Sequence, residues 1–358
     1  MEFDKGKKQY FTRELVRWHA MHNDRSLPWK NEKDPYRIWL SEVILQQTRA
    51  LQGLPYYLRF TEQYPTIKAM AAADQDAVFR MWQGLGYYNR CKNMLATARL
   101  ISEHHDGIFP GTYEGLLQLK GIGPYTASAI ASFAYGLPNA VVDGNVYRVL
   151  SRYFGIDTPF DTTDGKKIFA ALAYELLDTN DSAGYNQAIM DLGATVCTPR
   201  KPLCIQCPLQ KHCLAYAQGL TGMLPVKSKK INVKKRVFNY LLLHWQDELW
   251  LHRREAEDIW ENLNEPYLIE TNVPLDTQTL KKHDAFRSLQ LKYSMLEYGG
   301  SSTQRLTHQL ITGIFFIIKL TDKPEIRIEQ GNWRKITELD RIAFPKTVVS
   351  FFKNNLYF

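Results

Sequence analysis

Four of the five cysteines of this chain fall within residues 197–213, and their spacing constrains the fold more than any other feature. Gaps of six, two and five residues separate Cys197, Cys204, Cys207 and Cys213. Four thiolates on one loop can hold either a structural zinc ion or a 4Fe–4S cluster. Zinc sites usually combine two Cys-x2-Cys pairs, whereas only one such pair occurs here, and this favours the cluster. An odd cysteine count without a secretory signal argues against a disulfide framework.

Basic residues are interspersed among these cysteines, at Arg200, Lys201, Lys211 and His212. A rigid basic loop is well suited to contact phosphate groups. The metal centre could therefore have a purely structural role, in which it only holds this loop in place. The chain carries a formal net charge of +8, which favours a polyanionic partner. Many basic proteins bind no nucleic acid, so the charge alone does not identify the partner.

The chain of 358 residues is long enough for two domains, each with its own core. Residues 1–225 have periodic apolar positions between short polar breaks, which predicts a mostly helical domain. Residues 226–236 hold six cations and no acid, which indicates an exposed linker. No apolar run reaches the length of a membrane span, and the N-terminus lacks an apolar signal core. We therefore expect a cytoplasmic protein.

A different pattern follows the linker, over residues 237–358. Residues 237–243 and 249–252 flank a turn at Gln246-Asp247 and predict a hairpin. Leu310–Leu320 is expected to form a buried strand, and a helical end is expected near residues 338–354. The second domain is therefore predicted to be α+β.

The first candidate for acid–base chemistry is Glu42. Asp34-Pro35 predicts a helix start, and the residues from Tyr36 to Thr48 are apolar around nearly the whole circumference of the helix that follows. Burial in such a helix would raise the pKa of the Glu42 carboxyl, which could then donate a proton near neutral pH. The alternative is a Glu held by hydrogen bonds in a helical core or facing an ordinary cleft.

The second candidate is Asp143, which precedes apolar residues at helical spacing from Val146 onward. An ordinary helix N-cap is the simplest interpretation. The same position would keep the carboxylate ionised, because helix-end amides stabilise an anion. One protonated and one charged carboxyl group form a pair that can cleave a glycosidic bond.

Between the two carboxylates, Gly121-Ile122-Gly123 precedes a helix of small residues that begins at Pro124. Two glycines around one residue permit a tight turn with exposed amides, which can bind a phosphate without reading sequence. A simple turn between helices is an equal alternative for this segment alone. The order of the hairpin, Asp143 and the cysteine loop along the chain is a more specific indication of function than any one of the three features.

This order resembles the adenine DNA glycosylases of the MutY family, in the endonuclease III superfamily. The resemblance covers residue 9 to about residue 220 and rests on five segments, which are Leu27–Trp29, Ser41–Thr48, Gly84–Tyr88, Val142–Val146 and Asn186–Ala194. It implies a helix-hairpin-helix glycosylase domain over residues 1–225, with a 4Fe–4S cluster on the cysteine loop. It further implies that a monomeric, monofunctional enzyme removes adenine paired with 8-oxoguanine or guanine in double-stranded DNA, and is thereby associated with the nucleoid.

Residue roles also follow from the resemblance. By position, Glu42 would protonate the adenine and Asp143 would stabilise the cationic sugar, while Tyr125 and Asn145 would hold the reacting nucleotide and Asp143. The pocket for the extruded adenine would be lined by Arg25, Leu27, Trp29 and Gln187. The other DNA contacts would come from the wedge residues Gln47 and Tyr87, from Thr48, and from the hairpin glycines Gly121 and Gly123.

The second domain resembles the Nudix-like 8-oxoguanine recognition domain of that family more loosely. Thr307 and His308 would form its reading loop. Residues 260–267 depart from the usual pattern, and this puts the local structure near Asn262 in doubt. No Nudix hydrolase motif fits the sequence, so we expect no nucleotide hydrolysis from this half.

Three other functions compete with this interpretation. The first is an endonuclease III-like enzyme that removes oxidised pyrimidines and cuts the strand, although Tyr125 stands where its lysine would be needed. The second is a non-enzymatic DNA-binding or electron-transfer protein that uses the cluster. The third is a carbohydrate hydrolase with Glu42 and Asp143, against which the basic charge and the hairpin argue.

Overall fold

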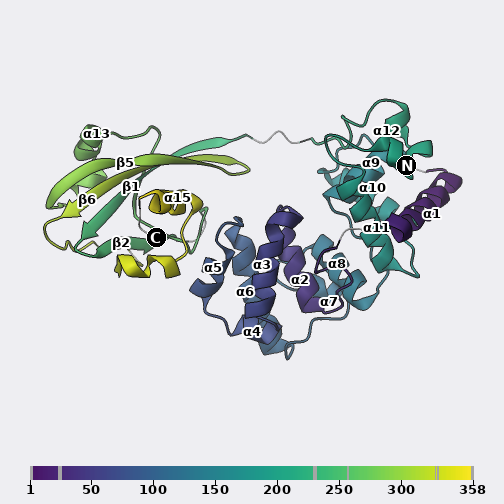
Figure 1. Ribbon diagram of the computed structural model, residues 1–358, viewed down its shortest axis with the longest axis horizontal. Coiled ribbons are helices and arrows are strands. Elements are labelled where there is room, and N and C mark those ends of the chain that lie inside the picture. Colours follow the sequence, from purple (N-terminus) through teal and green to yellow (C-terminus); the bar gives the residue numbers. More distant parts are fainter. Residues whose placement is uncertain are drawn as a thin grey trace. The chain divides into compact units, whose positions relative to one another are not determined.

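The computed structural model of the chain describes residues 3–22, 26–228, 232–255, 258–326, 328 and 330–355. Contacts between residues divide it into two compact units (Figure 1). One unit comprises Met1–Ala71 and Asn93–Lys230, and the other comprises Ala72–Lys92 and Ile231–Phe358. No helix within the described ranges is long and apolar enough to span a membrane.

The first unit is helical over its described residues, as the sequence predicts. One group of its helices comprises α2 (Pro35–Leu45), α3 (Ala50–Gln63), α4 (Ile67–Ala71), most of α6 (Tyr88–His104), α7 (Tyr113–Leu117) and α8 (Pro124–Tyr135). The other group comprises α1 (Lys5–His22), α9 (Gly144–Phe154), α10 (Thr163–Leu176), α11 (Ser182–Thr195), α12 (Leu214–Ala217) and the 3-10 turns Cys204–Gln206 and Gln210–His212 (Figure 1).

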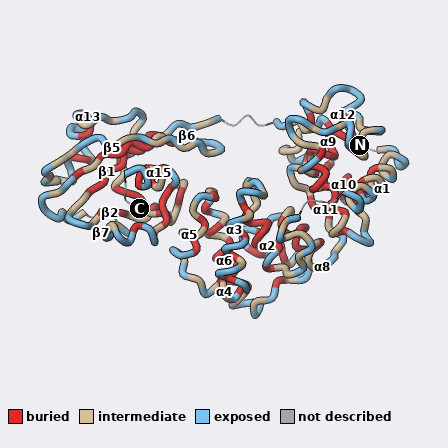
Figure 2. Tube along the Cα trace, in the orientation of Figure 1, coloured by how far each residue is buried: buried red, intermediate tan, exposed pale blue. Residues whose placement is uncertain are grey.

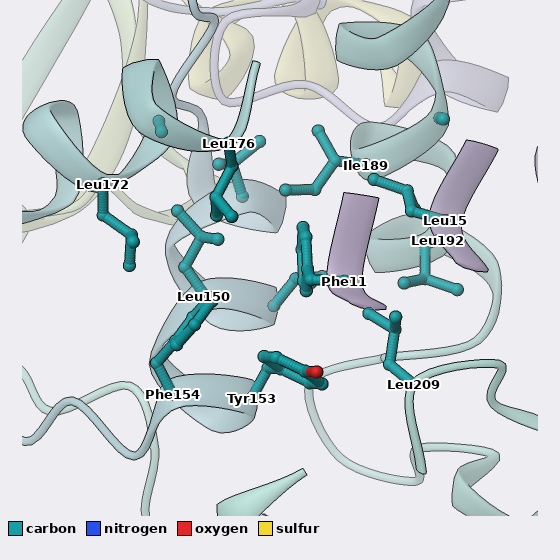
Figure 3. Close-up of a cluster of buried hydrophobic side chains, with 14 of the residues drawn as sticks. Phe11, Leu15, Leu150, Tyr153, Phe154, Leu172, Leu176, Ile189, Leu192 and Leu209 are labelled. Carbon is teal, nitrogen blue, oxygen red and sulfur yellow. The ribbon is translucent and has the colours of Figure 1, made fainter. Parts of the chain in front are cut away.

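The second group of helices encloses one hydrophobic core (Figure 3). Phe11 and Leu15 project from α1 into this core and are completely buried. Residues of α9, α10 and α11 surround them, and Leu209 joins the core from the cysteine loop. The loop is therefore anchored by apolar packing as well as by whatever its cysteines bind.

The helix that carries Glu42 begins as the sequence predicts. Asp34 is its N-cap and accepts a hydrogen bond from the Tyr36 amide at 2.9 Å, with Pro35 as the first helical residue. The predicted end at Thr48 is wrong, because α2 ends at Leu45. Gln47 has a φ of 56°, which lies in the left-handed region and cannot continue a right-handed helix.

The hairpin between α7 and α8 has the predicted shape. Gly121 has a φ of 78°, and a Cβ added there would lie 2.9 Å from the Cβ of Asn93. Gly123 is the extended N-cap of α8, which begins at Pro124. A residue with a side chain is therefore strained at position 121, and the two helices can meet in a tight turn.

A mixed sheet dominates the second unit, whose predicted α+β class is confirmed. Its strands follow the order β3-β2-β1-β6-β5, while β4 pairs with β1 and β7 with β2. Within the described residues, β1 and β6 form the only parallel pair of strands, and the other pairs are antiparallel. The strands are β1 (Lys234–Trp245), β2 (Glu248–Arg253), β3 (Asn264–Glu265), β4 (Tyr267–Thr271), β5 (Tyr293–Arg305), β6 (Gln309–Leu320) and β7 (Gly331–Lys335).

The predicted hairpin and buried strand are confirmed as β1–β2, with Trp245 opposite Glu248, and as β6. The predicted helical end is shared between a 3-10 turn, Ile336–Arg341, and α15 (Lys346–Asn354). The other helices of the unit are α5 (Gln75–Trp82), α13 (Thr277–Lys282) and α14 (Asp284–Arg287). Figure 2 shows that the central strands are buried, whereas much of the edge strand β5 is exposed.

The predicted linker over residues 226–236 lies only partly within the described residues. Residues 229–231 fall outside them, and β1 already begins at Lys234. Near Asn262, where the sequence departs from the family pattern, Trp260 and Asn262 both have left-handed backbone conformations, with φ values of 63° and 66°.

Candidate active site

A cavity of about 660 Å³ lies in the first unit, between its two groups of helices. This volume is within the range of sites that bind small organic groups. Helices α2 and α8 contribute lining residues from one side, and α9 and α11 from the other. The cavity brings together eight of the residues that the sequence singled out, namely Leu27, Trp29, Glu42, Thr48, Tyr125, Asp143, Asn145 and Gln187.

Glu42 is buried, with 7% of its surface exposed. The Tyr125 hydroxyl donates a hydrogen bond to Oε2 of Glu42 at 2.6 Å. Burial raises the pKa of the Glu42 carboxyl to about 7, the Tyr125 hydrogen bond lowers it, and the charge of Asp143 raises it further. A substantial fraction of Glu42 is therefore protonated at neutral pH, as a general acid requires.

Asp143 is the N-cap of α9. Its Oδ1 accepts hydrogen bonds from the backbone amides of Asn145 and Val146, each at 2.8 Å, and the Asn145 side chain donates to Oδ2 at 2.7 Å. Burial raises the pKa of Asp143, while these three hydrogen bonds and the charge of Arg148 lower it. From its position at a helix start, we predicted only that the pKa of Asp143 is lowered. The pKa is nevertheless raised overall, because the tertiary fold buries the carboxyl group.

Arg148, which the sequence did not single out, supports Asp143 indirectly, through Asn145. Its Nη2 donates to the side-chain oxygen of Asn145 at 2.8 Å and to the carbonyl oxygen of Gly193 at 2.7 Å. Its Nε donates to the carbonyl oxygen of Cys197 at 2.6 Å. A hydrogen-bonded path therefore runs from the cysteine loop to the candidate carboxylate.

The four cysteines of the loop line one small, apolar pocket. All are free thiols, and Arg152 donates a hydrogen bond to Sγ of Cys197 at 3.4 Å. Burial raises the pKa of the Cys207 thiol to about 12, so a metal would have to displace its proton. Among the described residues, no group of three or more His, Cys, Asp or Glu side chains is arranged to hold a single metal ion. Four thiols around one apolar pocket are the set of ligands that an iron–sulfur cluster uses, so the residues present fit such a cluster.

The two wedge candidates do not line the cavity. Gln47 and Tyr87 are both exposed, and both have left-handed backbones, with φ values of 56° and 50°. Such backbone strain in residues with long side chains persists only where the surrounding structure imposes it, and it is common at functional sites.

In the second unit, Thr307 and His308 are exposed residues between β5 and β6. The hydroxyl groups of Tyr87 and Thr307, both in this unit, form a hydrogen bond. Arg25, the remaining pocket candidate, lies outside the described residues.

Sequence reasoning also missed several residues that line the cavity, among them His19, Asn31, Lys33 and Met190. Asn31 and Lys33 follow Trp29 closely, so their proximity to a recognised segment was a usable signal. No pattern marked His19, whereas Met190 lies within Asn186–Ala194, one of the five segments that carry the resemblance.

Comparisons with known proteins agree with this geometry. Residues 40–173 match the HhH-GPD superfamily of base excision DNA repair proteins, and residues 197–213 match the iron-sulfur binding domain of endonuclease III. The fold and the site thus define a DNA glycosylase of base excision repair. Its cofactor is a 4Fe–4S cluster bound in the cysteine loop.

Two relatives and one solved structure show the closer kinship. The adenine DNA glycosylase of Buchnera aphidicola subsp. Acyrthosiphon pisum is 33% identical over 256 residues, which are 72% of this chain and 73% of that protein. The adenine DNA glycosylase of Homo sapiens is 41% identical over 214 residues, 57% of this chain and 39% of that protein. The structure of a thermostable thymine-DNA glycosylase superposes with a TM-score of 0.55 and 28% identity, covering 60% of this chain and 98% of that one.

The chain belongs to the adenine DNA glycosylase family. This confirms the predicted enzyme class over the non-enzymatic alternative.

Proposed function

We propose that the protein removes adenine mispaired with 8-oxoguanine or guanine from double-stranded DNA and leaves the strand uncut. The observation that supports this most directly is the pair of carboxylates on one cavity, in which burial raises the pKa of Glu42 to about 7. A glycosidic bond is broken by such a pair when one group donates a proton and the other stabilises the sugar cation.

The chemistry assigns a role to each side chain. An adenine nucleotide leaves the base stack and enters the cavity, since the bond is unreachable inside the duplex. Glu42 gives its proton to the departing base, and the Tyr125 hydroxyl keeps the carboxyl oriented. Asp143 stabilises the positive charge on the sugar and helps a water molecule add to it. Asn145 holds Asp143 in place for this step.

The remaining parts bind and select DNA. We assign phosphate contacts to the hairpin of Gly121 and Gly123 and to the basic cysteine loop, in which Cys197, Cys204, Cys207 and Cys213 hold the cluster. We assign lesion reading to Thr307 and His308, which are exposed in the C-terminal domain over residues 237–358. The catalytic domain over residues 1–225 then carries the chemistry, and we expect the protein to work as a monomer on chromosomal DNA in the cytoplasm.

The absence of strand cleavage provides the sharpest test. Cleavage after base release needs an amine that attacks the sugar, and the phenol at Tyr125 cannot form a Schiff base. Lys120 is exposed and does not line the cavity, whereas Lys33 does. The enzyme is incubated with an A:8-oxoguanine duplex, and half of the sample is then treated with hot alkali.

Cut product is expected only in the alkali-treated half. Nicking at neutral pH together with borohydride trapping would show that a lysine, with Lys33 the first candidate, supplies lyase chemistry. A parallel T:G duplex tests the activity named for the thymine-DNA glycosylase that this fold resembles, and a Glu42→Gln variant is the inactive control. Release of thymine but not adenine would overturn the proposal.

A further inference from the structure

A buried ion pair connects two segments that line the cavity. The Lys30 ammonium is 2.7 Å from Oδ2 of Asp191, and 6% and 3% of the two side chains are exposed. Nε2 of His19 is 3.3 Å from the same carboxylate oxygen. The carboxylate comes from α11, whereas Lys30 belongs to the segment over residues 26–34.

The neighbours of both charged residues line the cavity. Trp29 and Asn31 flank Lys30 in the sequence, and Met190 precedes Asp191 on α11. Lys30 and Asp191 themselves are not among the lining residues. The pair therefore joins two parts of the cavity wall, and its third member, His19, lines the cavity itself.

The wall on the side of Lys30 is held by a turn and by contacts of neighbouring side chains, among them the hydrogen bond that Lys33 Nζ donates to the Phe133 carbonyl oxygen at 3.2 Å. Residues 26–34 contain a turn, in which the Lys30 amide donates to the Leu27 carbonyl at 2.9 Å, but no helix or strand. Trp29 contacts Tyr57 edge to face, with ring centroids 5.3 Å apart. The aromatic contact supports one side of Trp29, and the ion pair ties the next residue to α11.

We propose that the Lys30–Asp191 ion pair, with His19 as its third member, sets the shape of the base pocket and thereby its selectivity for adenine. This inference rests on the proposed function. Lys30 and Asp191 are positioning residues, since they act through Trp29 and the lining residues of α11. A pocket that recognises polar groups of a base rejects an analogue only while its wall stays fixed.

Four variants of the full-length holoenzyme test the proposal. Lys30→Met removes the charge but keeps the length, and Lys30→Arg keeps the charge. The double change Lys30→Met and Asp191→Leu leaves no lone buried charge and so avoids the large loss of stability that a single unpaired charge causes. Lys68→Met is the matched control, because it breaks an ion pair of the same length, 2.7 Å, whose side chains are 58% and 87% exposed.

The measurement is the single-turnover rate of release of adenine and of hypoxanthine, each opposite 8-oxoguanine, with the melting temperature of each variant. We expect the adenine-to-hypoxanthine rate ratio to fall about tenfold in Lys30→Met and in the double variant. The ratio should stay close to that of the wild type in Lys30→Arg and Lys68→Met. A role in stability alone would lower both rates in parallel.

A parallel loss of both rates, or a ratio unchanged in the double variant, would overturn the inference. Equal release of the two bases by the unmodified enzyme would do the same, since no selectivity would then depend on the wall. Failure of the unmodified enzyme to release adenine at all would instead contradict the proposed function, so the two failures are distinguishable.

Discussion

Arg148 donates a hydrogen bond to the backbone carbonyl of Cys197 at 2.6 Å. The same guanidinium group contacts Asn145, which holds Asp143. Helix α9 therefore carries the candidate carboxylate at its N-cap and, about one turn later, an arginine that contacts the cysteine loop. A change in the loop would therefore reach Asp143 through Arg148 and Asn145, both of which line the cavity.

Replacing Arg148 with Met should slow base release by at least about tenfold, because the oxygens of Asn145, Gly193 and Cys197 lose a charged donor. The single-turnover rate is measured beside the iron and sulfide content of each preparation. Arg13→Met, at an exposed site, is the control. A wild-type rate in Arg148→Met would show that the path does not position Asp143.

The pH dependence of base release should reveal Glu42 through two variants with opposite shifts. The rate should fall as pH rises through about 7, because the proton donor is lost. Tyr125→Phe removes a hydrogen bond that lowers the pKa of Glu42, so the midpoint should move to higher pH. Asp143→Asn removes a charge that raises this pKa, so the midpoint of its much slower reaction should move to lower pH. Shifts in the same direction would contradict the assignment.

Glu42 should also lower the stability of the protein. The pKa of Glu42 in the folded protein, about 7, lies above the ordinary value of 4.5. The contribution of Glu42 to the free energy of unfolding is therefore fully favourable below pH 4.5 and is lost as the pH rises through about 7. Glu42→Gln should therefore stabilise the fold at about pH 8, by roughly 1–3 kcal/mol, and much less at about pH 5. Thermal unfolding at the two pH values measures this, and an equal effect at both would argue against a buried, titrating Glu42.

Gly193 permits the close approach of α11 to the active site. A Cβ at this position would lie 2.6 Å from the Cβ of Asn145 and 3.1 Å from its backbone. Gly193→Ala should therefore displace Asn145 and slow base release, with DNA affinity retained. Gly144→Ala is a local control, because no atom lies within 4 Å of its added Cβ. Equal rates in the two variants would show that the site tolerates the displacement.

Thr307→Ala should reduce the preference for A:8-oxoguanine over A:G without slowing release from A:G. The residue is exposed and its hydroxyl is hydrogen-bonded to Tyr87, so the change removes polar contacts but no packing. Rates on both duplexes give the preference, and Thr303→Ala, at an exposed site of β5, is the control. An unchanged preference would remove Thr307 from lesion reading.

The sequence predicted what depends on local patterns. The cap at Asp34, the burial of Glu42 and the helix start at Asp143 all follow from residues within one or two turns of each other. The early end of α2 was not predictable, because the strain at Gln47 breaks the preference of its residue type. Tertiary structure imposes such a conformation against local propensity.

The supports of the site could not be predicted for a related reason. Arg148 and Lys30 are basic residues, and a charged side chain ordinarily faces water, so neither residue was expected to be buried. Their partners lie far along the chain, at Cys197 and Asp191, and several of these partners are backbone carbonyls that carry no sequence signal.

The core beneath the cysteine loop has a consequence for the synthesis of the protein. The ribosome completes α1 first, yet Phe11 and Leu15 are buried by α9, α10, α11 and Leu209, which emerge much later (Figure 3). Helices α2, α3, α4, α7 and α8 meanwhile have neighbouring helices of their own group available. The first helix therefore cannot bury its apolar face fully until residue 209 has left the ribosome, although it is the first helix of the chain to be made.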